Sequence, residues 1–130
     1  MDQLIAQPPL AAVDFSVLEG LDDEPSEGEA DLIIELIDLY LGEVPQLLNA
    51  IRKGLEQNDW KSARRAAHTL RGSSANLGVL QLSSIADKLE RLEDTETNLA
   101  RVLCESLERE FVRVNELLTE ERQRRTACGF

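Results

Sequence analysis

The sequence predicts an all-α protein, folded as an antiparallel up-down-up-down four-helix bundle with a short extra N-terminal helix. Three observations lead to this fold class. Aromatic residues make up only 4% of the 130 residues, and runs of β-branched residues are scarce. Apolar residues recur at alternating intervals of four and three along four segments, the spacing of one face of an amphipathic helix. Short connections join these segments, and four such faces bury one another best in a bundle.

The length of the chain fits one domain over residues 1–130. Residues 1–12 contain two adjacent prolines, and we expect them to form a flexible lead-in. The core is expected within residues 14–118. Residues 122–130 are basic and contain glycine, so we expect a frayed tail there.

The first two predicted helices begin at residues that can cap them. Asp14 can cap a short helix that runs through Leu18, and an acidic loop follows it. Ser26 and Glu29 have the Ser-x-x-Glu spacing of a capping box, so a long helix is expected from there. Pro45 should bend this helix without ending it, because the apolar positions continue on both sides. These positions are Ile33, Ile37, Tyr40, Val44, Leu47, Ile51 and Leu55.

Three further helices complete the predicted bundle. Asn58 or Asp59 supplies the next N-cap, and this third helix ends at Gly78, a residue suited to the left-handed conformation that terminates helices. A fourth helix follows, and a turn at residues 94–97 leads into a long fifth. The apolar positions are Ala63, Ala67, Leu70, Ser74 and Leu77 in the third helix, Leu82, Ile85, Ala86, Leu89 and Leu92 in the fourth, and Leu99, Leu103, Leu107, Val114 and Leu118 in the fifth.

Composition narrows the class of function. The chain has 14 Lys and Arg against 25 Asp and Glu, a formal net charge of −11, so neither nucleic acid nor an anionic membrane surface is an expected partner. The most apolar stretch, residues 32–44, is interrupted by three acidic residues and should not span a bilayer. Cys104 and Cys128 have no metal-ligand spacing and indicate reduced thiols. We expect a soluble, cytoplasmic monomer.

The single histidine, His68, is expected to face solvent, because it lies away from the apolar positions of the third helix. It lies in a basic segment, residues 52–71, with six basic and two acidic residues, a local charge of +4. A neutral imidazole nitrogen is a good nucleophile toward an activated phosphoryl group, and Arg71, Lys61 or Arg64 could balance the added charge. The pattern therefore favours phosphoryl transfer through His68, although an exposed histidine alone is usually an ordinary surface residue.

Gly72 strengthens the hypothesis of a functional histidine. Glycine inside a helix costs about 0.5–1 kcal/mol relative to alanine, so some gain should compensate for it. Next to an exposed imidazole, Gly72 together with the small Ala75 would let another protein approach the helix closely. The alternative is close packing of a neighbouring helix against Gly72, which its position opposite the apolar face disfavours.

The segment from Ala67 to Gly78, Ala-His-Thr-Leu-Arg-Gly-Ser-Ser-Ala-Asn-Leu-Gly, resembles the signature of histidine-containing phosphotransfer (HPt) domains of multistep two-component phosphorelays. That signature has a basic residue three positions after the histidine, glycine at four, a small residue at six and glycine at ten. Residues 71, 72, 74 and 78 match it, with arginine where lysine is commoner. The resemblance covers roughly residues 14–118. It implies a four-helix bundle in which His68 is the phosphoacceptor.

The resemblance also implies partners. His68 would exchange a phosphoryl group with the aspartate of a response-regulator receiver domain, in a relay supplied by a hybrid sensor histidine kinase. The receiver would provide the acidic pocket and Mg²⁺, so no cofactor or metal of the chain's own is expected. The direction of transfer and the identity of the partners stay open, and the length favours a free-standing shuttle over a fragment of a kinase. Candidate docking residues are Ile34, Leu41 and Leu48, with Arg65; the three apolar ones could equally cover the N-terminal helix.

Two other classes of function compete with phosphotransfer: an autonomous enzyme and a structural adaptor. A kinase would need a glycine-rich phosphate loop, which the sequence lacks, and a di-metal bundle would need more than one histidine. The chain is therefore not expected to be an autonomous enzyme. The alternative is an adaptor bundle that docks a signalling partner without phosphotransfer; it leaves Gly72 and the arginines around His68 unexplained. Cys104 and Trp60 are interpreted as packing residues.

Overall fold

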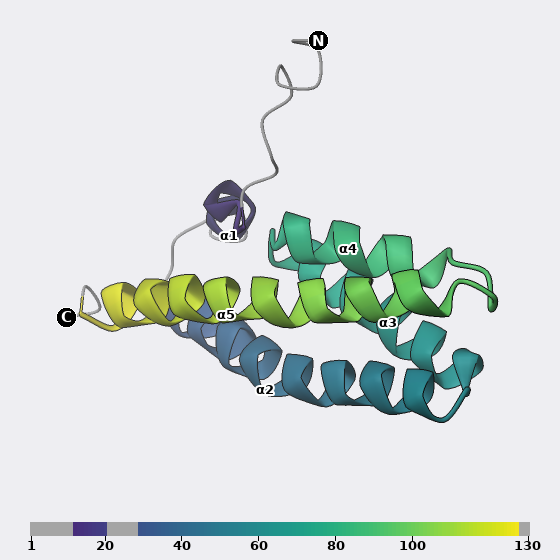
Figure 1. The fold of residues 1–130 in the computed structure, drawn as a ribbon. Coiled ribbons are helices and arrows are strands. Elements are labelled where there is room, and N and C mark those ends of the chain that lie inside the picture. Colours follow the sequence, from purple (N-terminus) through teal and green to yellow (C-terminus); the bar gives the residue numbers. More distant parts are fainter. Residues whose placement is uncertain (1–11, 21–28, 128–130) are drawn as a thin grey trace, which may run out of the picture.

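The computed structural model describes residues 12–20 and 29–127, and within them the chain is helical without strands (Figure 1). Its elements are α1 (Phe15–Gly20), α2 (Glu29–Glu56), α3 (Trp60–Asn76), α4 (Leu80–Glu90) and α5 (Thr97–Ala127). Helix α2 contacts α3 and α5, and α4 contacts the same two helices, so the four long helices surround one core. The predicted all-α bundle with a short N-terminal helix is confirmed.

The core runs along the inner faces of the four long helices. Its largest fully buried side chains are Ile33, Ile37, Val44, Ile51, Leu70, Val79, Leu82, Leu89, Leu107, Val114 and Leu118. Helix α2 is continuous through Pro45, as predicted, while Ser26 of the proposed capping box lies outside the described residues. Leu48 is buried, and Leu47 and Leu55 are only partly buried. The apolar positions predicted for α2 cover too narrow a part of the helix surface, because α2 packs against α3 on one flank and against α5 on the other.

The N-terminal helix is attached to the turn between α3 and α4. Asp14 caps α1 as predicted, its Oδ1 accepting from the backbone N–H of Ser16 at 3.0 Å. The N–H of Asp14 also donates to the carbonyl of Gly78 at 2.6 Å. Gly78 has the expected left-handed φ of 77°, and a Cβ there would collide with the Asp14 carbonyl. Ala12, the last residue of the predicted lead-in, is buried with the core; residues 1–11 lie outside the described part.

One hydrogen-bonded pair fixes the residue at which α3 starts, and another fixes the position of α3 along α2. Asp59 is the N-cap: its carboxylate accepts from the backbone N–H of Ser62 at 3.2 Å and from the Ser62 hydroxyl at 2.7 Å. These bonds hold the pKa of Asp59 below its ordinary value. Near the other end, the Tyr40 hydroxyl lies 2.7 Å from Ser74 Oγ inside the core. Burial raises the pKa of Tyr40, and the pair sets which residues of α2 and α3 lie opposite each other.

Helix α5 departs from its predicted form at both ends. It stays helical through residue 127, so the expected frayed tail is wrong for residues 122–127; residues 128–130 are not described. Ion pairs fix this last part, because Arg122 Nε donates to Asp38 of α2 at 2.7 Å and a buried Glu121 pairs with Arg125 at 2.7 Å. At the other end Leu99 is exposed and Ala100 is buried in its place.

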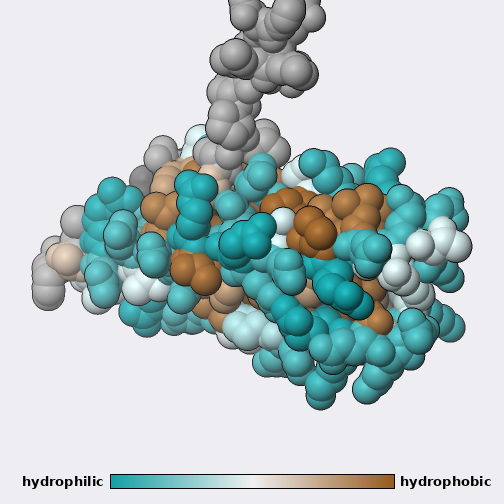
Figure 2. All heavy atoms as spheres, in the orientation of Figure 1, coloured by the Kyte–Doolittle hydropathy of each residue, from teal (hydrophilic) through white to brown (hydrophobic). Residues whose placement is uncertain are grey.

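The surface is mainly hydrophilic, with apolar side chains in restricted places. Figure 2 shows the face that carries α5: hydrophilic side chains dominate it, and apolar ones gather on the side toward α4 and α1. The large apolar side chains exposed among the described residues are Leu32, Leu39, Leu99, Val102 and Val112. Two of the five lie on α2, beside the helix that carries the histidine.

Candidate functional site

His68 projects from the surface of α3, as the sequence predicts, with its side chain 61% exposed. Its Nδ1 lies 2.7 Å from Oε2 of Glu90, near the end of α4. The other oxygen of Glu90 accepts from Nε of Arg71 at 3.1 Å, and Nη2 of Arg71 lies 3.1 Å from the same imidazole nitrogen. One carboxylate, one guanidinium and one imidazole therefore form a closed triangle across two helices.

Two contacts at Nδ1 bear on the tautomer of His68. Oε2 of Glu90, which as an ionised carboxylate only accepts hydrogen bonds, lies 2.7 Å from Nδ1, and Nη2 of Arg71, which only donates, lies 3.1 Å from it. The shorter contact, with the carboxylate, favours the tautomer that has its ring proton on Nδ1. The lone pair of the neutral ring is then on Nε2, the nitrogen that does not contact Glu90. Glu90 was missed from the sequence, because it is 22 residues from His68 and only the packing of α4 on α3 brings the two together.

Arg71 is held beside His68 from three directions. Its side chain contacts Glu90, and its Nε lies 3.9 Å from Oδ1 of Asp87 on the same face of α4. Its main-chain carbonyl accepts from the hydroxyl of Ser83 at 2.9 Å. The two carboxylates hold the guanidinium near the imidazole, and the bond from Ser83 fixes the backbone of α3 at Arg71. Of the three cations expected to stabilise a phosphoryl group, Arg71 is the one the structure places against His68.

The surface beside His68 is open at Gly72. A Cβ built on Gly72 would meet no atom within 4 Å, so close helix packing does not explain the glycine. Gly72 and Ala75 line a shallow groove of about 430 Å³ between α3 and α4, together with Arg71, Leu80, Ser83, Ser84, Asp87 and Arg91. The open backbone lies one helical turn beyond His68 on α3.

The other basic residues of α3 divide into two groups. Lys61 and Arg65 are exposed, and neither forms an ion pair within the described residues. Arg64 instead donates to the carbonyl of Leu92 at 2.6 Å, pairs with Asp94, and lies 5.2 Å from the centre of the Trp60 ring. The expected contact of Arg64 with His68 is therefore not formed, because its side chain is held in the corner where α3 meets the connection between α4 and α5.

The docking residues predicted on α2 lie on the flank of that helix that faces α5. Leu48 is only 7% exposed and belongs to the core, while Leu41 is partly buried and packs against it, and Ile34 is partly buried. Four residues after Leu48, Arg52 pairs with Glu108, so this flank faces α5. Arg65 alone of the four candidates is exposed on α3.

The flank of α2 that faces α3 carries a different apolar group. Leu39 is 70% exposed, and with Leu36 it lines a groove of about 440 Å³ whose other residues are Tyr40, Glu43, Ser73, Asn76 and Leu77. Leu32, Leu36 and Leu39 follow one another at intervals of four and three. This spacing is visible in the sequence as a second apolar line, and it could have identified the groove.

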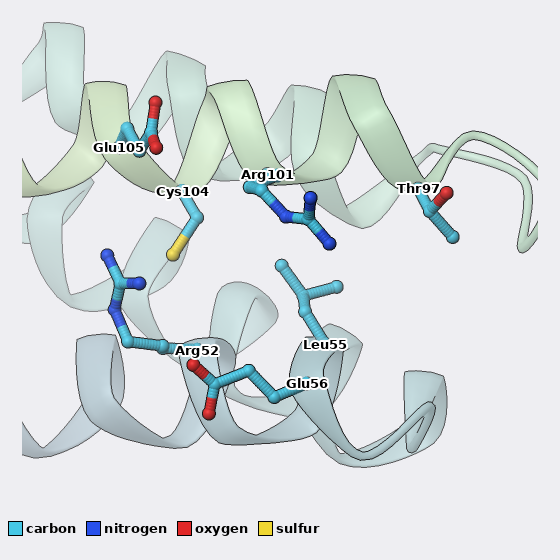
Figure 3. Close-up of a pocket in the computed structure, with 7 residues that line it drawn as sticks. All are labelled: Arg52, Leu55, Glu56, Thr97, Arg101, Cys104 and Glu105. Carbon is cyan, nitrogen blue, oxygen red and sulfur yellow. The ribbon is translucent and has the colours of Figure 1, made fainter.

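A second concavity lies between α2 and α5 and contains a different set of side chains (Figure 3). It measures about 80 Å³ and is lined by Arg52, Leu55, Glu56, Thr97, Arg101, Cys104 and Glu105. Burial raises the pKa of the Cys104 thiol, so the thiol is protonated and behaves as a packing group. Cations and carboxylates alternate around this cavity, which gives it no preference for one charge.

Residues 12–20 and 29–127 contain no cluster of three or more His, Cys, Asp or Glu side chains placed to hold a metal ion. Among the helices of the same ranges, none has the length and apolarity needed to cross a bilayer.

Comparison with known proteins gives one consistent result. Residues 35–124 match the family model described as the Hpt domain. Two curated relatives are the phosphorelay intermediate protein rdeA of Dictyostelium discoideum, 28% identical over 73% of this chain, and histidine-containing phosphotransfer protein 5 of Arabidopsis thaliana, 26% identical over 69%. These matches span 38% and 57% of the two relatives. The crystal structure of histidine-containing phosphotransfer protein B from Pseudomonas aeruginosa PAO1 superposes with a TM-score of 0.74 and 29% identity, covering 87% of this chain and 96% of that one. The chain belongs to the Hpt domain family.

Proposed function

We propose that this protein is a phosphorelay intermediate that carries a phosphoryl group on His68, received from or passed to the aspartate of a response-regulator receiver domain. The observation that carries the proposal is the exposed imidazole held through Nδ1 by Glu90, with Arg71 beside it. Membership of the Hpt family and the similarity to named phosphotransfer proteins support the same reaction class. A hybrid sensor histidine kinase is the proposed source of the phosphoryl group in the relay.

The proposed reaction is one displacement at phosphorus. The lone pair of His68 Nε2 attacks the phosphorus of an aspartyl phosphate, the P–N bond forms, and the electron pair of the breaking P–O bond returns to the aspartate carboxylate. The ring retains its proton at Nδ1 and becomes positively charged, and Glu90 stabilises that charge. In the reverse direction the aspartate oxygen attacks phosphorus and the P–N electron pair returns to Nε2.

The residues around His68 have separate roles in this proposal. Glu90 is a positioning residue that acts through the imidazole, and Arg71 neutralises charge on the phosphoryl oxygens. Lys61 lies on the same exposed face of α3 and adds to the positive potential. Mg²⁺ would be bound by the receiver, whose acidic pocket would complete the site. Gly72 and Ala75 leave the room in which that pocket approaches.

The decisive experiment measures phosphoryl transfer to the full chain from a panel of purified receiver domains labelled with radioactive phosphate in the presence of Mg²⁺. We expect label on the wild type that is stable to alkali and labile to acid, as a phosphoramidate is, and no label on His68→Gln. Absence of label from every receiver, with helical circular dichroism intact, would favour the adaptor that docks a partner without phosphotransfer.

Glu90→Gln tests the positioning role in the same assay. Glutamine keeps the shape and one acceptor but loses the charge, and a hydrogen bond to a charged group contributes about 1.5–3 kcal/mol, so transfer should slow by roughly 10- to 100-fold. A matched variant away from the site, Glu116→Gln on the exposed surface of α5, should transfer at the wild-type rate. Equal rates for Glu90→Gln and wild type would refute the role of Glu90.

A further inference from the structure

Arg64 of α3 is held in one place by three groups, none of which is His68. Its Nη2 donates to the main-chain carbonyl of Leu92 at 2.6 Å and also contacts the carboxylate of Asp94. Its guanidinium lies 5.2 Å from the centre of the ring of Trp60, which is within the range of a cation–π interaction. The Arg64 side chain is 35% exposed, so these contacts cover most of it.

The contacts of Arg64 fasten the chain just beyond α4 to α3. Glu90, which contacts His68, is the last residue of α4, and Arg91 is the C-cap. The carbonyl that Arg64 binds belongs to Leu92, two residues after Glu90. On α3, Arg64 precedes His68 by four residues, about one helical turn. The Arg64–Leu92 bond and the His68–Glu90 contact are therefore neighbouring cross-links between the same two segments of chain.

The position of Glu90 at the end of a helix calls for a restraint on the backbone. The last carbonyl groups of a helix have no partners within it, and helix ends fray. Leu89 is buried and Leu92 is partly buried, but apolar packing is non-directional and does not set the rotation of the last turn. Arg71 binds the other carboxylate oxygen of Glu90, a contact that restrains the side chain and not the backbone. The bond from Arg64 supplies a directional restraint at this end of α4.

We propose that Arg64 is a positioning residue that acts through Glu90. By holding the carbonyl of Leu92, it fixes the last turn of α4 and keeps the Glu90 carboxylate at Nδ1 of His68. The effect on phosphoryl transfer rests on the proposed function, whereas the effect on the imidazole can be measured without any partner. This role differs from the one expected from the sequence, in which Arg64 would balance the charge of the phosphoryl group directly.

The tautomer of His68 tests the proposal on the protein alone. The chain has one histidine, so protein labelled with ¹⁵N in histidine gives a single pair of ring-nitrogen signals, which distinguish a proton on Nδ1 from one on Nε2 when the ring is neutral. We expect the proton mainly on Nδ1 in the wild type. Glu90→Ala should shift it toward Nε2, and Arg64→Gln should shift it part of the way. Arg109→Gln removes the same charge from the exposed surface of α5 and should give the wild-type spectrum.

A double-mutant cycle in the transfer assay tests the route by which Arg64 acts. Arg64→Gln should slow transfer about fivefold, and less than Glu90→Ala does, because it loosens the contact with His68 without removing the carboxylate. In the Glu90→Ala background the same substitution should change the rate by less than about twofold. Asp94→Asn should stay within about twofold of wild type, because Asp94 is 64% exposed and the bond to Leu92 is kept.

A milder variant keeps the test valid if Arg64→Gln does not fold, which circular dichroism would show. Arg64→Lys retains the charge and a donor on a shorter side chain without the planar fork, so it should shift the tautomer of His68 in the same direction by a smaller amount.

Three results would overturn the proposal. Wild-type ring signals in folded Arg64 variants would show that packing alone places Glu90. Equal slowing by Arg64→Gln with and without the Glu90 carboxylate would show that Arg64 acts on the phosphoryl group or on the partner. A wild type with its ring proton on Nε2 would show that Glu90 does not hold the imidazole. Wild-type protein that accepts label from no receiver would count against the proposed function alone, because the ring signals still report on the action of Arg64 through Glu90.

Discussion

Gly72→Ala should make the protein more stable and a poorer phosphotransfer partner. A Cβ at this position has no atom within 4 Å, so the substitution introduces no clash and gains the helix propensity of alanine, about 0.5–1 kcal/mol. For a chain of this size, that gain raises the midpoint of thermal unfolding by roughly 2–5 °C. In the proposed function the same methyl group stands where the receiver approaches, and we expect transfer to His68 to slow by about tenfold.

The assay for this prediction pairs thermal unfolding by circular dichroism with the receiver transfer measurement on the same samples. Gly54→Ala is the structural control, because its Cβ would lie 3.0 Å from both the backbone nitrogen and the Cβ of Ala63. That variant should unfold at a lower temperature than wild type. A Gly72→Ala protein that is less stable than wild type would refute the argument, since it would mean that the glycine serves the fold. A Gly72→Ala protein that transfers at the wild-type rate would show that no partner atom comes close to residue 72.

Three further predictions concern the scaffold of α3. Ser74→Ala leaves the buried Tyr40 hydroxyl without its partner and should lower the free energy of unfolding by about 1–3 kcal/mol in urea titration, whereas Tyr40→Phe combined with Ser74→Ala should recover part of the loss. Leu70→Ala removes a fully buried side chain and should cost about 2–5 kcal/mol in the same titration; a smaller loss would mean that the core collapses around the site. Asp59→Ala removes the hydrogen bonds that the cap accepts from Ser62, and these bonds lower the pKa of Asp59 from its ordinary value of 3.8. The cap therefore stabilises the fold fully at a pH above 3.8, and this stabilisation is lost as the pH falls through the lowered pKa. Melting temperatures of wild type and Asp59→Ala should therefore differ at neutral pH and converge in acid, and a constant difference would contradict the assignment.

The features that sequence reasoning predicted correctly are those decided within one helix. The exposure of His68 and Gly72 follows from their angle to the apolar positions of α3, and the cap at Asp59 and the left-handed Gly78 follow from local backbone chemistry. None of these needs knowledge of a neighbouring helix. The match of the segment around His68 to the Hpt signature depends on the same local pattern.

The features that could not be predicted depend on which helices are neighbours and on which residues of two neighbouring helices lie opposite each other. The contact of His68 with Glu90 requires the register of α3 against α4, which periodicity does not contain. Leu48 and Leu39 lie on opposite flanks of α2, and only the order of helices around the core decides that one flank meets α5 and the other α3. The expected contact of Arg64 with His68 does not form for another reason: the long side chain of Arg64 reaches Asp94 instead.

The composition of α3 and its partner on α2 offers a way to observe the protein without labels. The chain contains one histidine, one tryptophan and one tyrosine. His68 is the proposed phosphoacceptor, Trp60 begins the same helix beneath Arg64, and Tyr40 lines the groove between α2 and α3. Imidazole resonances in a proton NMR spectrum would therefore report on the state of His68 alone. Changes in tryptophan fluorescence would report on the first turn of α3, and changes in tyrosine signal on the groove. A receiver domain without aromatic residues of its own at the interface could be titrated against the unmodified protein, with three separate signals from three known positions.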